Sequence, residues 1–286
     1  MAENLIAAQA SNPHLKNFDE YKKLYDQSIE NPKEFFKKIA NENLSWIKDF
    51  TEVHNNRFAN AKWFADGKIN VSENCIDRHL KDRSDKVALI WEGDEPGNSK
   101  SFTFKKLHEE VCSLSNVLKN LNVSKGSRVC IYMPMIPEAA FAMLACTRIG
   151  AIHSVVFGGF ASNELASRID DSKAKILVTA SCGFEPGRTV EYKPLVDKAL
   201  ELSSHKIEKV IFFQRPGNEV KLNTPRDIDW DEALSNAQNT DCVEMNSNDY
   251  AYILYTSGTT GIPKGIVRDI GAVSYTHLTL PTIYSV

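Results

Sequence analysis

The sequence lacks any apolar run long enough to cross a membrane, and this sets the first limits on its function. Its longest apolar stretch is interrupted by Pro134, Pro137 and Glu138, whereas a membrane-spanning helix needs about 20 apolar residues in a row. The first residues show neither the basic-then-apolar pattern of a secretory signal nor the arginine-rich pattern of a transit peptide. The sequence therefore predicts a cytoplasmic protein that does not bind membranes.

Neither sign of charge dominates the sequence. It has 34 basic and 37 acidic residues, interleaved along the chain, and a formal net charge of −3. A broad basic face, as nucleic-acid-binding proteins carry, is therefore not expected. A locally positive pocket is still compatible with this balance, so the expected partners are small molecules and not nucleic acid.

Cysteine pairs with metal-binding or redox spacing are also missing. None of the six cysteines forms a C-x-x-C pair, and Cys130 and Cys146 are typical in lying within apolar stretches. This pattern indicates buried thiols in a reducing compartment, and no residue is assigned as a metal ligand.

From Lys86 onward, short apolar segments alternate with amphipathic ones. The alternation predicts an α/β fold with largely parallel sheets covered by helices on both faces, and the polar residues 215–248 are expected to form exposed loops. The expected strands are 87–91, 101–104, 128–133, 151–157, 175–179, 209–213 and 250–255; the expected helices are 104–121, 137–150, one capped by Ser162, and 195–202.

The N-terminal part of the chain has a different character. Residues 1 to about 70 are polar and dotted with aromatic side chains, and apolar residues four apart between Phe35 and Leu44 predict an amphipathic helix. Residues 74–80 indicate another short helix. Trp63 and Phe64 are interpreted as packing anchors. We assign residues 1–85 to a helical N-terminal extension and residues 86–272 to the first part of a large domain.

Residues 273–286 do not continue this pattern. Hydroxyl and β-branched residues follow abruptly, without cap, period or turn, and the segment resembles the translation of a sequencing-library adapter. A native C-terminal strand is the alternative. We treat the segment as a non-native tail and exclude it from arguments on fold and function.

A glycine- and hydroxyl-rich loop follows the strand expected at 250–255. Such loops at strand ends present ligand-binding groups in α/β sheets, and glycines let backbone N–H groups turn inward to bind an anion. The expected phosphate ligands are Thr256, Ser257, Gly258, Thr259, Thr260, Gly261, Lys264 and Gly265. The set predicts a polyphosphate site in which Lys264 supplies a cation.

Other loop types fit less well. A Walker loop needs glycine before the lysine and a hydroxyl after it, whereas Pro263 precedes Lys264 and Gly265 follows it. The spacing is also not G-x-G-x-x-G. A flexible Ser/Gly linker is the remaining alternative, and the embedded Pro-Lys-Gly between two apolar strands argues against it.

The segment Y-T-S-G-T-T-G-I-P-K-G, residues 255–265, resembles the signature of the adenylate-forming superfamily. Residues 63–70, 74–79, 133–138 and 150–160 are similar to the acetyl-CoA/propionyl-CoA synthetase branch. The resemblance implies the incomplete large N-terminal domain of an adenylate-forming enzyme, cut off before its C-terminal domain. It also implies that the substrates are ATP with Mg²⁺, coenzyme A and a short acid, acetate or propionate, and that Lys264 is catalytic.

Two alternatives remain open at this point. The acyl pocket of such enzymes would lie beyond Gly271, so a longer or aryl acid is possible as substrate. The second alternative is a nucleotide-binding fragment with no catalysis of its own. We expect the 286-residue chain to be inactive alone.

Residues 183–188 are similar to the family's coenzyme A segment, G-x-R-x-G-R. Arg188 matches the second arginine, which implies a contact with a coenzyme A phosphate, whereas Glu185 stands where the first arginine is usual. The stretch E-P-G-R-T-V-E-Y-K-P-L, residues 185–195, resembles the propionate-type or mitochondrial-like branch more than the standard acetate enzymes. Gly158 and Gly159 match the region that lines the pantetheine tunnel, or they form a tight strand-to-helix turn. His153 is interpreted as a core histidine and not as a base.

Overall fold

The structure is a computed structural model that describes residues 15, 17–55, 61–93, 97–185, 187–256 and 263–272. It contains two compact units. Unit 1 comprises the residues up to Ile69 together with 246–248 and those from Asp269 onward, and unit 2 comprises Asn70–Met245 and Asp249–Arg268. The expected non-native tail, 273–286, and the phosphate ligands expected from Ser257 to Gly261 lie outside the described residues.

Unit 1 is built on the helices α1 (Phe18–Glu30) and α2 (Pro32–Asn43). Proline at the first turn of α2 costs no hydrogen bond. The helix buries Phe36 and Ala40, four residues apart, against an aromatic cluster that contains Phe64. The Trp63 ring meets that of Phe36 edge-on at 5.2 Å. The amphipathic helix and both packing anchors are confirmed.

Unit 2 holds a seven-stranded sheet in the order β11-β10-β4-β3-β5-β8-β9. All strand pairs from β10 to β9 are parallel. The strands are β3 (Arg128–Met133), β4 (Ile152–Phe157), β5 (Ile176–Ala180), β8 (Lys209–Phe213), β9 (Asp227–Asp229), β10 (Tyr250–Thr256) and β11 (Lys264–Asp269). The largely parallel α/β sheet is confirmed.

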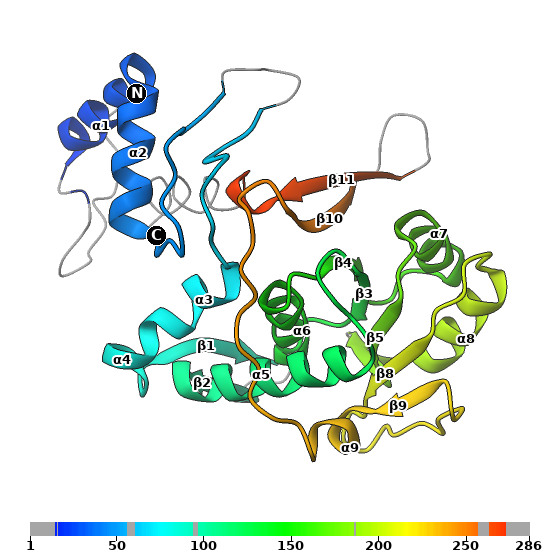
Figure 1. The fold of residues 1–286 in the computed structure, drawn as a ribbon. Helices are drawn as coiled ribbons and strands as arrows, with labels where there is room; N and C mark the ends of the chain where they lie inside the picture. The colour runs from blue at the N-terminus through cyan, green and yellow to red at the C-terminus, as the bar shows by residue number, and fades with distance from the viewer. Residues whose placement is uncertain are drawn as a thin grey trace. The chain divides into compact units, whose positions relative to one another are not determined.

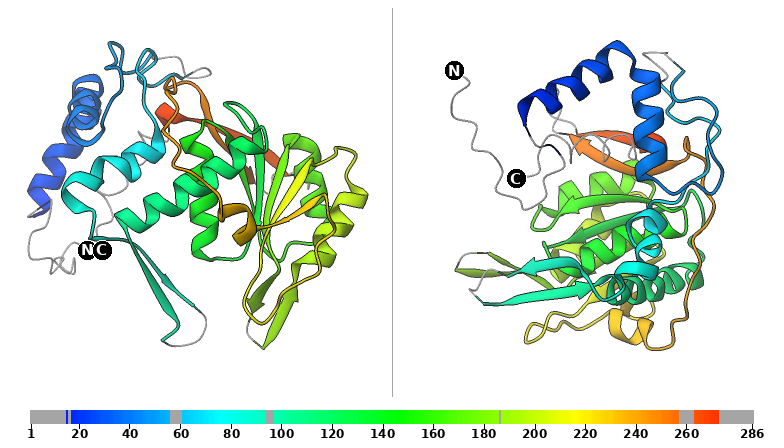
Figure 2. Two further views of the ribbon diagram at one scale, coloured as in Figure 1. Left: turned by 60° about the horizontal axis from the view of Figure 1, so that its bottom comes forward. Right: turned by 90° about the vertical axis from the view of Figure 1, so that its left-hand side faces the viewer.

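Helices cover both faces of this sheet. In Figures 1 and 2, α5 (Phe104–Asn120) and α6 (Pro137–Arg148) lie on one side, and α7 (Ser162–Ser172) and α8 (Tyr192–Leu202) on the other. Every residue of β5 is buried, as expected for a parallel strand between two helical layers. The apolar stripe of α5, formed by Leu107, Val111, Leu114 and Leu118, is buried in the same core.

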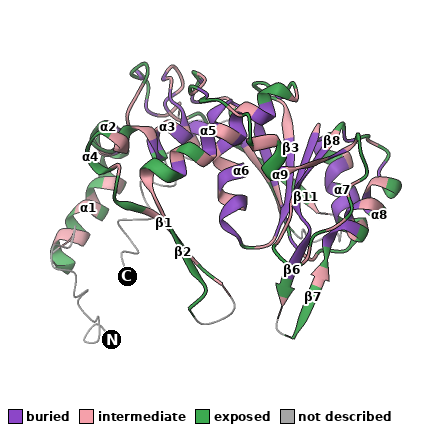
Figure 3. Ribbon diagram, turned by 90° about the horizontal axis from the view of Figure 1, so that it is seen from below, coloured by how far each residue is buried: buried purple, intermediate pink, exposed green. Residues whose placement is uncertain are grey.

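Short helices and two hairpins complete unit 2. The helices are α3 (Val71–Cys75), η1 (Asp77–His79), α4 (Leu80–Arg83) and α9 (Trp230–Leu234). The hairpins pair β1 (Val87–Glu92) with β2 (Ser99–Thr103), and β6 (Cys182–Glu185) with β7 (Arg188–Glu191). Figure 3 shows both hairpins projecting to the same side of the buried strands.

The first helices of unit 2 come from the segment that we assigned to the N-terminal extension. Residues 70–85 belong to unit 2, and a buried side chain explains why. The amide of Asn70 donates to the carbonyl oxygens of Thr147, Arg148 and Val243, at 3.1, 3.1 and 2.9 Å. A fully buried amide needs such partners, so Asn70 fixes the start of α3 on unit 2.

Two local expectations were wrong. Ser162 does not cap α7: Ala161 holds the cap position, without a side-chain hydrogen bond, and Ser162 is the first helical residue. Residues 215–248 are not only exposed loop, because they contain β9 and α9, and Trp230 is 3% exposed. In the part of the chain that the structure describes, no helix is both long and apolar enough to cross a membrane.

Candidate functional site

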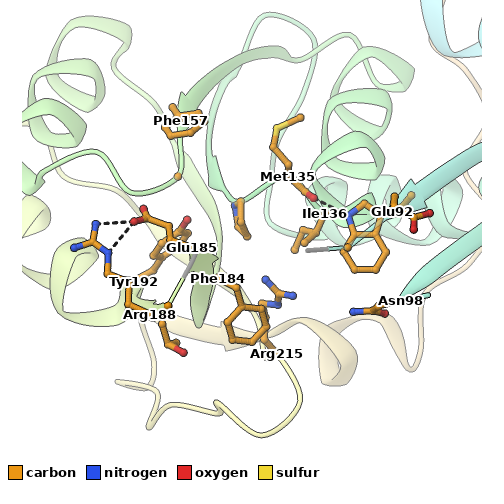
Figure 4. Close-up of a pocket in the computed structure, with 16 residues that line it drawn as sticks. Glu92, Asn98, Met135, Ile136, Phe157, Phe184, Glu185, Arg188, Tyr192 and Arg215 are labelled. Atoms are coloured by element: carbon orange, nitrogen blue, oxygen red, sulfur yellow. Dashed lines mark hydrogen bonds and ion pairs between the residues drawn. The ribbon is translucent and has the colours of Figure 1, made fainter. Parts of the chain in front are cut away.

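A pocket of about 830 Å³ opens at the carboxyl end of the sheet in unit 2. Its walls come from the segments that follow β3, β4 and β8, from both hairpins and from the start of α8. We call it the hairpin pocket and define it by Trp91, Met135, Gly158, Phe184, Arg188 and Arg215. In Figure 4 the labelled side chains of Met135, Phe184, Arg188 and Arg215 come from separate elements around this pocket.

Topology explains why a pocket forms there. β3 lies between β4 and β5, and all three run parallel. The chain leaves β3 toward α6 on one face of the sheet, and α8, which leads to β8, covers the other face. Segments that diverge in this way leave a crevice at the carboxyl ends of the strands, which is where α/β sheets bind ligands.

One wall is fixed by a hydrogen bond between distant segments. The Trp91 indole N–H donates to the Met135 carbonyl oxygen at 2.7 Å, which joins the first hairpin to the segment after β3. The rim beside this contact is apolar and open: the side chains of Met135 and Phe157 are 81% and 62% exposed. Exposed apolar groups at the mouth of a pocket are typical of a ligand-binding rim.

Arg188 lies on the wall formed by the second hairpin, where the Glu185 carboxylate meets it. Glu185 Oε2 accepts hydrogen bonds from Arg188 Nε at 2.8 Å and from a terminal guanidinium nitrogen at 2.6 Å. The sequence placed both residues in the coenzyme A segment, and the structure brings both to the hairpin pocket. The proposed contact between Arg188 and a phosphate remains a prediction.

Arg215 is a site residue that the sequence analysis missed. It follows the carboxyl end of β8, and its guanidinium carbon lies 4.1 Å from the centre of the Phe184 ring. The backbone N–H of Arg215 donates to Ser181 Oγ at 2.9 Å. The sequence feature that could have identified Arg215 is a cation two residues after the end of an apolar strand, in Phe213-Gln-Arg-Pro.

Gly158 and Gly159 occupy a turn at the end of β4. A Cβ atom on Gly158 would lie 2.3 Å from the Tyr192 hydroxyl oxygen and 2.6 Å from the Met133 carbonyl oxygen, and Gly159 has φ of +97°. Both positions therefore need glycine for the turn itself. Gly158 also lines the hairpin pocket, so the structural and the ligand-facing interpretations of this residue are compatible.

The expected phosphate loop is anchored at both ends. Thr256 ends β10, and Lys264 and Gly265 begin β11, the neighbouring strand. The Tyr255 hydroxyl donates to Asp171 Oδ2 at 2.6 Å. A Cβ on Gly265 would lie 3.3 Å from that same oxygen. Asp171 of α7 thus lies beside both strands that carry the loop, and Lys264 is exposed.

Arg168 connects this anchored region with the end of β4. Its guanidinium carbon lies 5.2 Å from the Phe160 ring centre and 5.4 Å from that of Tyr255. It also donates to Glu164 Oε2 at 2.6 Å, and the residue is 7% exposed. Cation–π contacts of a desolvated guanidinium are stabilising, so Arg168 ties the loop strand β10 to the turn beside the hairpin pocket.

Comparison with known proteins identifies the family. Residues 76–284 match the model of the AMP-binding enzyme family, and residues 21–75 match that of the acetyl-coenzyme A synthetase N-terminus. The chain belongs to the AMP-binding enzyme family. The resemblance drawn from the loop and from the four earlier segments is confirmed.

Curated relatives and a solved structure extend this result. The chain is 54% identical over 260 residues to an acetyl-coenzyme A synthetase of the gammaproteobacterium EBAC31A08, covering 91% of this chain and 40% of the relative. It is 46% identical to the human mitochondrial acyl-CoA synthetase short-chain family member 3, covering 93% and 39%. The fold matches acetoacetyl-CoA synthetase from Streptomyces lividans with a TM-score of 0.83 and 25% identity, covering 91% and 40%. The chain thus spans about 40% of the length of these proteins.

In this member of the AMP-binding family, His153 lies in the core as expected. It is 8% exposed, its ring lies 5.6 Å from that of Tyr252, and burial lowers its pKa to about 4. A buried histidine that stays neutral throughout the physiological range is interpreted as a packing residue and not as a base.

The thiols agree in part with the expectation. Burial raises the pKa of Cys130 to about 12 and that of Cys146 still further, so both are unreactive. Cys75 differs, because it is exposed.

Proposed function

We propose that this chain is the first part of a short-chain acyl-CoA synthetase that converts acetate or propionate, ATP and coenzyme A into acyl-CoA, AMP and pyrophosphate. One observation carries the proposal: the model of the acetyl-coenzyme A synthetase N-terminus matches residues 21–75, and the AMP-binding enzyme model follows it directly and spans the loop at 256–265. A cytoplasmic location is part of the proposal.

The first half-reaction forms an acyl-adenylate. A carboxylate oxygen of the acid attacks the α-phosphorus of MgATP, a new P–O bond forms, and the bond to the bridging oxygen breaks to release pyrophosphate. In-line displacement of this kind depends mainly on positioning and on neutralising charge. We assign Thr256, the loop to Gly261, Lys264 and Gly265 to the β- and γ-phosphates, with Lys264 offsetting the charge of the departing pyrophosphate.

The second half-reaction transfers the acyl group to sulfur. The thiolate of coenzyme A attacks the acyl carbon, and AMP leaves with the electron pair of the broken C–O bond. We assign the hairpin pocket to the nucleotide end of coenzyme A. Its volume of about 830 Å³ lies in the range of ligand sites, about 300–1,000 Å³. Two arginines of this pocket, Arg188 and Arg215, are the candidate cations for a phosphate, and Gly158 and Gly159 leave space for the pantetheine arm.

Acid-dependent exchange of labelled pyrophosphate into ATP tests the first half-reaction in the whole enzyme. Exchange with acetate or propionate, and none without acid, is the expected result. Adding butyrate and acetoacetate to the panel of acids distinguishes acetate or propionate from a longer acid as the substrate. Acetoacetate is included because the fold resembles that of an acetoacetyl-CoA synthetase. Absence of exchange with every acid of the panel contradicts the proposal.

A further inference from the structure

The hairpin pocket contains two arginines, and they differ in how their charge is already used. Arg188 is exposed on β7, and its guanidinium makes two hydrogen bonds to one oxygen of Glu185, at 2.8 and 2.6 Å. A guanidinium and a carboxylate joined in this way largely cancel each other's field at a ligand. Arg188 is therefore a weak site for a further anion as long as Glu185 holds it.

Arg215 is in the opposite situation. Within the described residues, no hydrogen bond or ion pair joins its guanidinium to another side chain; its contact is the face of Phe184, at 4.1 Å. Figure 4 shows the Arg215–Phe184 stack apart from the Arg188–Glu185 pair. Stacking holds a guanidinium by its face and leaves the N–H groups at its edge available to an oxygen ligand.

The backbone holds Arg215 ready for such a ligand. Its N–H group is fixed by Ser181 Oγ at 2.9 Å. The preceding residue, Gln214, closes the loop by donating to the Val220 carbonyl at 3.0 Å and by accepting from the Val220 N–H at 3.0 Å. A cation on a fixed loop loses little conformational entropy when it binds an anion.

The other carboxylates near the pocket form no ion pair with Arg215 among the described residues. Glu92 lines the pocket from the first hairpin, but it is exposed, and solvent and salt screen such a charge. Glu138 lines the adjoining cavity together with Arg215. It is 8% exposed. Burial raises the pKa of Glu138, and the nearby charges of Lys100 and Arg215 oppose that shift.

The geometry points to Arg215, stacked on Phe184, as the residue that binds a phosphate group of the coenzyme A nucleotide, while Glu185 withholds Arg188 from that role. This inference rests on the proposed use of the pocket for coenzyme A. It assigns the pocket's main anion contact to a residue 27 positions away from the motif that resembles the family's coenzyme A segment.

Calorimetric titration of the 286-residue chain with coenzyme A tests the inference through a matched pair of variants. Arg215→Gln is expected to weaken binding about 10-fold or more, the effect of losing a charge-assisted hydrogen bond. Arg188→Gln, which removes the same charge from the same pocket, is expected to change it less than about 3-fold. Thermal unfolding of each variant verifies that the fold is retained.

Glu185→Gln supplies a third arm with the opposite sign. It frees Arg188, so coenzyme A is expected to bind more tightly, and Arg188→Gln in that background is expected to reverse the gain. Titration with 3′-dephospho-coenzyme A shows which phosphate is bound: the Arg215→Gln effect disappears if it is the 3′-phosphate and persists if it is the diphosphate.

Equal affinities of wild type and Arg215→Gln for coenzyme A overturn the inference, as does a larger loss in Arg188→Gln than in Arg215→Gln. The exchange assay for the proposed function contains no coenzyme A, so the two proposals fail separately. If pyrophosphate exchange is observed but Arg215→Gln binds coenzyme A like the wild type, only the role of Arg215 is contradicted. If no exchange is observed but Arg215→Gln weakens coenzyme A binding, only the adenylation reaction is contradicted.

Discussion

At the scale of single residues, three charged side chains of the hairpin pocket, Glu185, Arg188 and Arg215, are held by different contacts. Glu185 and Arg188 were recognised from the segment G-F-E-P-G-R, and both lie at the hairpin pocket. Arg215 was not found, because its availability depends on a stack with Phe184 from another strand and on the pairing of Arg188 elsewhere. Such relations between segments have no signature in a local pattern.

Lys264 gives the sharpest residue-scale prediction for catalysis. Lys264→Ala in the whole enzyme is expected to lower pyrophosphate exchange about 100- to 1,000-fold, the usual cost of losing one group that stabilises transition-state charge. Lys264 is exposed at the start of β11, so the unfolding free energy is expected to stay unchanged. Exchange at the wild-type rate in this variant contradicts the role of Lys264.

Gly183 tests the packing around Tyr192 at the same scale. A Cβ on Gly183 would lie 2.4 Å from the hydroxyl oxygen of Tyr192 and 2.8 Å from its Cζ atom. Gly183→Ala is therefore expected to destabilise the chain by about 1–3 kcal/mol in urea unfolding. The same substitution is expected to cost at least 1 kcal/mol less in a Tyr192→Leu background, because the clashing ring is gone. Equal costs in both backgrounds rule out this contact.

At the scale of elements, the sequence predicted correctly the helices and strands with a regular apolar period, but not the short strands of mixed polarity. The strands at 128–133 and 209–213 and the helix from Phe104 were placed within about one residue, because their apolar residues follow one period throughout. The hairpin β6–β7 was missed, since each strand has four residues of mixed polarity. The cap of α7 was misplaced because Ala161 gives no side-chain signal.

A partly buried ionic cluster joins η1, α5 and α6. Arg148 donates to both carboxylate oxygens of Asp77, at 2.7 and 2.9 Å, and His108 Nε2 lies 3.4 Å from Asp77 Oδ1. Burial alone would raise the pKa of Asp77, but the hydrogen bonds from His108 and Arg148 hold it well below its usual value. The hydrogen bond to Asp77, followed by the contact with Cys112, raises the pKa of His108 to about 9.

This cluster predicts how stability depends on pH. Because the folded-state pKa of His108 is above its unfolded value of about 6.5, its stabilisation is complete below pH 6.5 and is lost as pH rises through about 9. Asp77 has the opposite sign, so its contribution is present above pH 4 or so and is lost in acid. The cluster is therefore expected to stabilise the fold most between about pH 4 and about pH 6.5.

Urea unfolding at pH 6.5 and pH 9.5 measures the effect. His108→Gln is expected to lose about 1–2 kcal/mol at pH 6.5 and to approach wild type at pH 9.5. A difference between the two proteins that is the same at both pH values contradicts a charged His108. The exposed pair Lys22–Asp26 offers a control, since Lys22→Gln is expected to change stability little at either pH.

At the scale of the whole molecule, the chain supplies the pocket and the strands that flank the loop, but it spans only about 40% of the length of its relatives. The 286-residue chain alone is expected to bind coenzyme A without catalysing pyrophosphate exchange. Calorimetry and the exchange assay on the same preparation test this separation. Robust exchange by the isolated chain contradicts it.

Analysis of the reaction products distinguishes an AMP-forming acyl-CoA synthetase from ligases that release ADP. The whole enzyme is incubated with MgATP, coenzyme A and either acetate or propionate, and nucleotides and thioesters are quantified by chromatography. AMP and the matching acyl-CoA are expected in equal amounts. Release of ADP and inorganic phosphate in place of AMP, or no acyl-CoA with either acid, contradicts it.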